Sequence, residues 1–282
     1  MTNTIADIEQ ADVILITGSN TSENHPVISS VVKRAVHVKG KQLIVVDPRR
    51  ITMTRYARKW LRPNLGTDVA WINGLMQVII SEGLHDRAFV DARTTGFEAL
   101  RQTVEKYTPE FVETITGIRS VDLIEAARMY AGAERASILY CMGITQHTTG
   151  TDNVKSLANL AMLCGHIGRP GTGVNPLRGQ NNVQGACDMG GLPDVFSGYQ
   201  KVTDEAARRR MAAAWKVDSL PAFAGLKVTQ MLPAAHDGKL KAMYIIGENP
   251  LVSDADLNHA EQSLRQLGFL VVQDIFLTET AK

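Results

Sequence analysis

The sequence has little of what marks secreted, membrane-spanning or nucleic-acid-binding proteins. Its three cysteines, Cys141, Cys164 and Cys187, are odd in number and spaced too widely for a metal knuckle, so reduced and mostly buried thiols are expected. No apolar run approaches the ~18 residues of a membrane span, and no signal-peptide pattern is present. A net charge of +1 gives no reason to expect nucleic acid or a membrane surface as a partner. These absences favour a cytoplasmic protein.

The composition is that of a globular chain with room for two domains. Of 282 residues, 44% are hydrophobic and 21% are charged, which is typical of folded domains. Short apolar runs alternate with helix-like segments, and this alternation predicts parallel sheets with crossover helices. We therefore expect an α/β fold of two Rossmann-like domains with mostly parallel sheets, at residues 1–180 and 181–282.

The expected elements can be placed along the chain. The strands are Val13–Ile16, Leu43–Val46, Ser137–Tyr140, Ala242–Ile246 and Leu270–Asp274. The helices open at His25-Pro26, run from Thr67 or Asp68 to about Gly83, follow a capping Ser120, and run from about Thr151 to Cys164.

Two polar turns follow predicted strands, Gly18-Ser19-Asn20 and Gly247-Glu248-Asn249-Pro250. Each is followed by a helix and then by a strand that ends in an acidic residue, Asp47 or Asp274. In open α/β sheets such turns bind anions, and such carboxylates accept hydrogen bonds from ribose or guanine. Each half could therefore hold one nucleotide, although any α/β protein needs such turn residues. The Gly-x-Gly-x-x-Gly pattern is missing, which argues against NAD or FAD.

The run Arg178–Gly190 is the least like an ordinary structural segment. It combines a cation, four amides and three glycines, and it has neither a helical nor a strand period. Apolar residues alternate into the polar run, as expected where a loop packs against a polar partner. This composition favours a binding or catalytic site over a solvated loop, which glycine and asparagine would also permit.

These segments together resemble the molybdopterin-guanine-dinucleotide oxidoreductases. The resemblance is carried by Asp47-Pro48-Arg49, by Gly18-Ser19-Asn20 with His25-Pro26, and by Gly165–Gly171 leading into Gly173–Pro176. Within that family, Arg178–Gly190 is most similar to the catalytic alpha subunits of formate dehydrogenases. The resemblance extends over essentially the whole chain.

The resemblance implies a cofactor and a reaction. Two molybdopterin guanine dinucleotides would hold molybdenum or tungsten, and the parent enzyme would oxidise formate to carbon dioxide. The family's iron–sulfur cluster and the protein ligand of the metal lie upstream of anything in this sequence. The chain is thus expected to be an internal fragment of a larger multidomain subunit, inactive alone. Its partners would be formate, the remaining domains of the subunit and iron–sulfur electron-transfer subunits.

The same resemblance assigns candidate site residues. Arg178 falls where the family has its active-site arginine, and its planar guanidinium matches the two oxygens of a carboxylate. Gln180 would contact a pterin or hold the loop. For the first dinucleotide the implied residues are Gly18, Asn20, Glu23, Asp47, Arg49, Gly66, Asp68, Met142, Gly143 and Gln146. For the second they are Gly247, Glu248, Asn249, Ser253, Gln273 and Asp274. No metal ligand is expected, because no histidine pair has the spacing of a helical metal site.

Three other interpretations stay open at this point. A related enzyme with another substrate, such as a nitrate or arsenate reductase, would differ in the protein ligand of the metal. A non-catalytic, pterin-free electron-transfer or scaffold subunit is a second alternative, against which the presence of Arg178 and both nucleotide turns argues. An unrelated α/β nucleotide-binding protein is the third, and it would require the long loop to match by chance.

Overall fold

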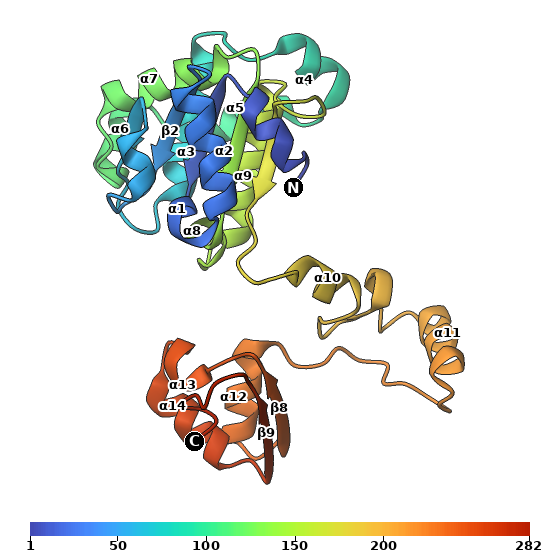
Figure 1. The fold of residues 1–282 in the computed structure, drawn as a ribbon. Helices are drawn as coiled ribbons and strands as arrows, with labels where there is room; N and C mark the ends of the chain where they lie inside the picture. The colour runs from blue at the N-terminus through green and yellow to red at the C-terminus, as the bar shows by residue number, and fades with distance from the viewer. The chain divides into compact units, whose positions relative to one another are not determined.

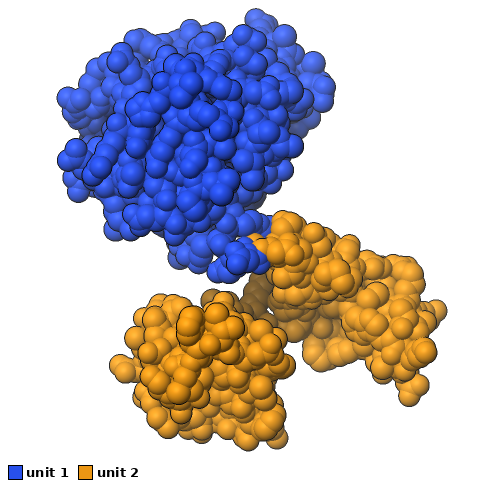
Figure 2. Space-filling view, viewed as in Figure 1, with its two compact units in different colours: residues 1–181 blue, residues 182–282 orange.

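The computed structural model describes residues 1–282 and divides them into two compact units. Met1–Asn181 form the first unit and Asn182–Lys282 form the second (Figure 2). The sequence had placed a domain boundary between residues 180 and 181. Each unit has its own apolar cores.

The first unit is built on a five-stranded sheet in which all neighbouring strands are parallel. The strand order is β3-β2-β1-β4-β5. The strands are β1 (Val13–Thr17), β2 (Gln42–Val46), β3 (Lys59–Leu61), β4 (Ala136–Tyr140) and β5 (Gly173–Pro176). Strand β1 pairs on one side with β2 and on the other with β4, so the strand order reverses between β1 and β4.

Helices cover both faces of this sheet (Figure 1). One face packs against η1 (Ile5–Gln10), α2 (Pro26–His37) and η2 (Thr52–Arg55). The other packs against α3 (Asp68–Ser81), α4 (Arg87–Arg93), α5 (Phe97–Val104), α6 (Pro109–Thr116), α7 (Ser120–Ala131) and α9 (Gly150–Leu163). The short helices α1 (Thr21–Asn24) and α8 (Met142–Thr145) follow β1 and β4.

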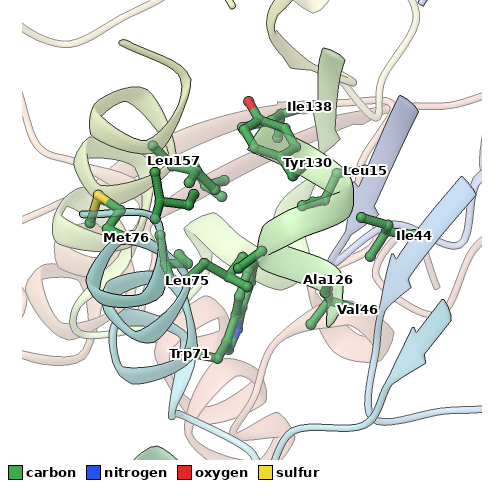
Figure 3. Packing of buried hydrophobic residues seen from close by; sticks show 14 of the residues in the cluster. Leu15, Ile44, Val46, Trp71, Leu75, Met76, Ala126, Tyr130, Ile138 and Leu157 are labelled. Carbon is green, nitrogen blue, oxygen red and sulfur yellow. The ribbon is translucent and has the colours of Figure 1, made fainter. Parts of the chain in front are cut away.

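The apolar run of β1 is explained by burial on both faces. Val13 and Leu15 join the core under α3, α7 and α9, whereas Ile14 and Ile16 join the core under α2. Successive side chains of a strand point to opposite faces, so a strand covered on both sides must be apolar throughout. Figure 3 shows the first of these cores, in which Trp71 of α3 packs among side chains from the helices and the sheet.

Local sequence signals set several helix ends, but one predicted cap is wrong. Helix α6 starts at Pro109 after Thr108, whose hydroxyl accepts from the Phe111 N–H, and it is terminated by Gly117, which has φ +72°. Ser120, expected to cap α7, is instead its first residue. Its hydroxyl donates to Glu113 at 2.6 Å, so Ser120 ties α7 to α6.

The second unit contains two small sheets. An antiparallel hairpin of β6 (Val195–Phe196) and β7 (Gln200–Lys201), joined by η3 (Ser197–Tyr199), shares a core with α11 (Glu205–Trp215). A parallel pair, β8 (Ala242–Ile246) and β9 (Phe269–Gln273), packs against α12 (Val228–His236) and α14 (Leu257–Arg265). The remaining helices are α10 (Val183–Asp188) and α13 (Pro250–Ser253). The predicted α/β fold with mostly parallel strands is confirmed.

Candidate functional site

The carboxyl ends of β1 and β4 form the expected ligand position, since open parallel sheets bind ligands where the strand order reverses. Gly18 follows β1, Gly143 lies just after β4, and the Gly143 N–H donates to the Gly18 carbonyl at 3.0 Å. A Cβ on Gly18 would lie 2.6 Å from the carbonyl carbon of Gly143, and a Cβ on Gly143 would lie 2.6 Å from the Gly18 Cα. Gly18 also has φ +57°, which favours glycine. The two loops therefore touch through bare backbone.

A cavity of about 40 Å³ opens at this crossing. Its lining consists of Thr17, Gly18, Val46, Pro48, Pro63, Asn64, Leu65, Gly66, Asp68, Gly143 and His147. The structure thus brings four predicted residues, Gly18, Gly66, Asp68 and Gly143, to one cavity. A larger surface cavity of about 320 Å³ lies beside α4, α5 and α9, but its lining contains no charged side chain. Of these two cavities, only the smaller one has titratable side chains in its lining, namely Asp68 and His147.

Asp68 supplies a carboxylate to this cavity. Burial raises the pKa of Asp68, while the Trp71 indole N–H, 3.1 Å from Oδ1, and the nearby His147 act in the opposite direction. The Nε2 atom of His147 bonds the Gly143 carbonyl at 2.9 Å and lies 3.7 Å from Asp68 Oδ2. His147 was not among the predicted site residues, although it follows the predicted Gln146. A partly buried carboxylate with a raised pKa is suited to accept a hydrogen bond from a ligand.

Asp47 provides a second carboxylate, just after β2. It is 4% exposed, and burial raises its pKa while the Arg49 N–H, 2.8 Å from Oδ1, lowers it. Its carbonyl accepts from the Trp60 indole at 2.9 Å, which fixes the turn. Arg49 itself is exposed. The turn therefore presents a carboxylate and a cation at adjoining positions.

The turn after β1 contains an unpaired buried acceptor. Asn20 caps α1 through its carbonyl, which accepts from Glu23 and Asn24 at 3.1 and 3.0 Å, while its Oδ1 is buried without a hydrogen-bond partner. Buried polar atoms are normally paired, so a donor from a bound molecule would satisfy this oxygen. Glu23 of α1 and Met142 and Gln146 near α8 are exposed beside the same strand ends.

These features fit a ligand with hydrogen-bond donors, such as a nucleotide, at the edge of the first unit. The glycine contact brings the loops after β1 and β4 together there, and the orphaned Asn20 oxygen and the Asp47 carboxylate can accept hydrogen bonds from the ligand.

Arg178 and Gln180 follow β5 on the same unit and are both exposed. The charge of Arg178 acts on the buried phenol of Tyr140, the last residue of β4. Burial raises the pKa of Tyr140, and the charge of Arg178 opposes that rise. Arg178 therefore lies near the end of β4, where the glycine crossing is formed.

The rest of the long run differs from the expected loop. Val183–Asp188 form the short helix α10, whose first turn is capped by the Asn182 side chain accepting from the Gly185 N–H at 3.3 Å. No residue from 181 to 190 is buried, and Met189 is 74% exposed. Val183 and Cys187 are half-buried, whereas Ala186 and Met189 are exposed.

In the second unit the predicted residues gather at the carboxyl ends of β8 and β9. Gly247, with φ +63°, Glu248 and Asn249 follow β8, and Ser253 lies in α13. Gln273 ends β9, and Asp274 follows it. Asn249 has an internal role, since its Oδ1 accepts from Thr280 Oγ1 at 2.7 Å and its Nδ2 donates to Glu279 at 2.8 Å. The Tyr244 hydroxyl is hydrogen-bonded to the Gln273 side chain. The residues share one end of a sheet, but two of them already have side-chain partners.

No group of three or more histidine, cysteine, aspartate or glutamate side chains is arranged to hold a metal ion. No helix is both long enough and apolar enough to span a membrane.

Comparison with known proteins identifies the family. The family described as molybdopterin oxidoreductase matches residues 1–282, and the chain therefore belongs to it. The chain is 54% identical to the F420-dependent formate dehydrogenase subunit alpha of Methanocaldococcus jannaschii, over 100% of this chain and 41% of that protein. It is 47% identical to formate dehydrogenase H of Escherichia coli, over 100% of this chain and 39% of that protein. The chain thus spans about two fifths of these relatives.

A solved structure resembles the fold. Acetylene hydratase from Pelobacter acetylenicus has a TM-score of 0.73 and 23% identity, covering 98% of this chain and 42% of that one. At this identity the likeness shows the fold alone.

Proposed function

We propose that the chain is the cofactor-holding part of a formate dehydrogenase alpha subunit, which oxidises formate to carbon dioxide at a bis-pterin molybdenum or tungsten centre. The observation that carries the proposal is 54% identity to a formate dehydrogenase alpha subunit along the entire chain. Because the chain spans 41% of that relative, we expect activity of the complete subunit and none of this part alone.

The first unit would bind one molybdopterin guanine dinucleotide at the crossing of Gly18 and Gly143. Backbone N–H groups in turns that follow parallel strands commonly donate to phosphate oxygens. Asn20 Oδ1 would accept a hydrogen bond from the ligand, and Asp47 would accept from a guanine edge or ribose. The further contacts proposed for this dinucleotide are Glu23, Arg49, Gly66, Asp68, Met142 and Gln146.

The second unit would bind the other dinucleotide through the carboxyl ends of β8 and β9. The proposed contacts are Gly247, Glu248, Asn249, Ser253, Gln273 and Asp274. The bound metal and its pterins would supply the two-electron redox chemistry, in which formate loses a proton and two electrons.

Arg178 would bind the two oxygens of formate through its guanidinium. The group is planar, permanently charged and exposed at the end of β5, so it can orient a small carboxylate by paired hydrogen bonds. Gln180 would hold a pterin or the loop, because its amide both donates and accepts. Electrons would leave through an iron–sulfur cluster elsewhere in the subunit and through iron–sulfur partner subunits in the cytoplasm.

The test is to purify the complete polypeptide without oxygen and to measure its metal, its pterin dinucleotides and its formate-dependent dye reduction. Molybdenum or tungsten with two pterin dinucleotides and formate-dependent reduction is the expected result. Cofactor without formate oxidation would contradict the substrate, and a protein that carries no cofactor would contradict the enzyme as a whole.

A further inference from the structure

The peptide groups on both sides of the Arg178 Cα are held by side chains from two other loops. The carbonyl of Leu177 accepts from the Cys141 thiol at 2.7 Å, and the carbonyl of Arg178 is bonded by His25 Nε2 at 2.6 Å. The Leu177 N–H also donates to the Tyr140 carbonyl at 2.7 Å. His25 precedes α2 on the β1 side of the crevice, and Cys141 follows β4 on the other side.

This arrangement constrains the direction of the arginine side chain. Each peptide group is planar, so fixing the carbonyls before and after a residue fixes its φ and ψ and thereby its Cα–Cβ direction. Arg178 is exposed, and the fold holds its backbone on both sides of the Cα. A long, flexible side chain is positioned more precisely when the backbone that carries it is fixed.

His25 is itself firmly placed. Its N–H donates to the Thr21 carbonyl at 3.0 Å, and its carbonyl accepts from the Ser29 N–H at 2.9 Å. The following Pro26 restricts the backbone of His25. A bond from Nε2 to a carbonyl requires the proton on Nε2, which sets the orientation of the ring.

We propose that His25 is a positioning residue for Arg178, acting through the hydrogen bond from its Nε2 to the Arg178 carbonyl, with Cys141 as the second holding group. The inference rests on the proposed function in one respect, namely that Arg178 binds formate. It assigns to the imidazole a role in substrate orientation in which the ring itself touches neither substrate nor cofactor.

The test compares four variants of the complete, cofactor-loaded subunit. His25→Ala removes the donor. Glutamine places its amide nitrogen near the position of Nε2 and asparagine near that of Nδ1, so His25→Gln should keep the bond and His25→Asn should lose it. His37→Ala is the matched control, because His37 ends the same helix α2 and is exposed.

We expect the KM for formate to rise about fivefold in His25→Ala and His25→Asn, the ratio that corresponds to one ordinary hydrogen bond. His25→Gln and His37→Ala should stay within about twofold of the unmodified enzyme, and metal and pterin contents should be equal in all. A lower kcat with an unchanged KM would indicate a merely structural role and would overturn the proposal. A KM for formate in His25→Gln as high as that in His25→Ala would also overturn the proposal.

Hydrogen exchange of a peptide covering residues 175–182 gives a second readout that needs no formate. Exchange there should be about fivefold faster in His25→Asn than in His25→Gln. If the unmodified enzyme oxidised no formate, the proposed function would fail, yet this comparison would still decide whether His25 holds the Arg178 backbone. Equal exchange in the two variants would refute the holding role even if formate were oxidised.

Discussion

Replacement of Gly18 by alanine tests whether the contact between the loops after β1 and β4 is rigid. The added Cβ would lie 2.6 Å from the Gly143 carbonyl carbon, 0.8 Å short of the 3.4 Å at which ordinary van der Waals contact begins. The opposing atoms are backbone, which cannot swing aside as a flexible side chain would. Overpacking of this kind costs about 1–3 kcal/mol, and a left-handed alanine costs roughly 1–2 kcal/mol more.

Gly40→Ala is the matched control, because Gly40 has φ +67° and no neighbouring atom within 4 Å of its added Cβ. In Gly40→Ala the free energy of unfolding should fall only by the cost of a left-handed alanine, roughly 1–2 kcal/mol. The free energy of unfolding should therefore fall by about 2 kcal/mol more in Gly18→Ala than in Gly40→Ala. Urea unfolding followed by tryptophan fluorescence measures this, because Trp71 is fully buried in the first unit.

Equal losses in these two variants would refute the reasoning. They would show that the loops after β1 and β4 separate easily and that the close approach of Gly18 and Gly143 does not define the crevice. In the complete enzyme, a displaced Gly18 loop should also lower the content of pterin dinucleotide, whereas Gly40→Ala should leave it unchanged.

Three further predictions concern single side chains. Arg178→Ala in the complete enzyme should abolish formate turnover with cofactor content intact, as measured by dye reduction and mass spectrometry; loss of both would make Arg178 a cofactor clamp. Asp47→Asn should stabilise the chain at neutral pH while lowering dinucleotide occupancy. Burial raises the pKa of Asp47 above its usual 3.8, so the folded chain holds this proton more tightly and loses stability as the pH rises from about 3.8 through the folded pKa. In urea unfolding, the free energy of unfolding of Asp47→Asn should exceed that of the unmodified chain at pH 7 but not at pH 3. Cys141→Ser, which keeps a donor to the Leu177 carbonyl, should retain a lower formate KM than Cys141→Ala, and equal KM values would remove Cys141 from the holding of Arg178.

Continuous apolar runs made most of the sheet predictable. Strands β1, β2 and β4 are buried on both faces, and their sequences show it directly. Strands β3 and β5 were not predicted, because one contains Lys59 and the other contains glycine and proline. Strand β3 is extended because it pairs with β2, and β5 because it pairs with β4. These pairings form only in the folded chain.

The candidate site was predictable where it depends on turns and less so where it depends on contacts. Gly18 and Gly143 were expected from their places after strands, but their mutual contact follows from the order of the strands. His147 was not assigned to the site from the sequence. Its contacts with the Gly143 carbonyl and with Asp68 arise only when the chain folds. Val183–Asp188 form the helix α10 where the sequence, having no helical period there, predicted a loop.

The strand order also has a consequence for the pathway of folding. Strand β1 meets β2 after one short crossover, since Val13 pairs with Gln42, but it meets β4 only when Ala136 returns from a distant part of the chain. Closing the longer loop costs more chain entropy and takes more time. We therefore expect β1 and β2 to associate first and β4 to dock later. The crossing of Gly18 and Gly143 would then be among the last features of the first unit to form, and a nascent chain would acquire its candidate site only after the sheet around it had assembled.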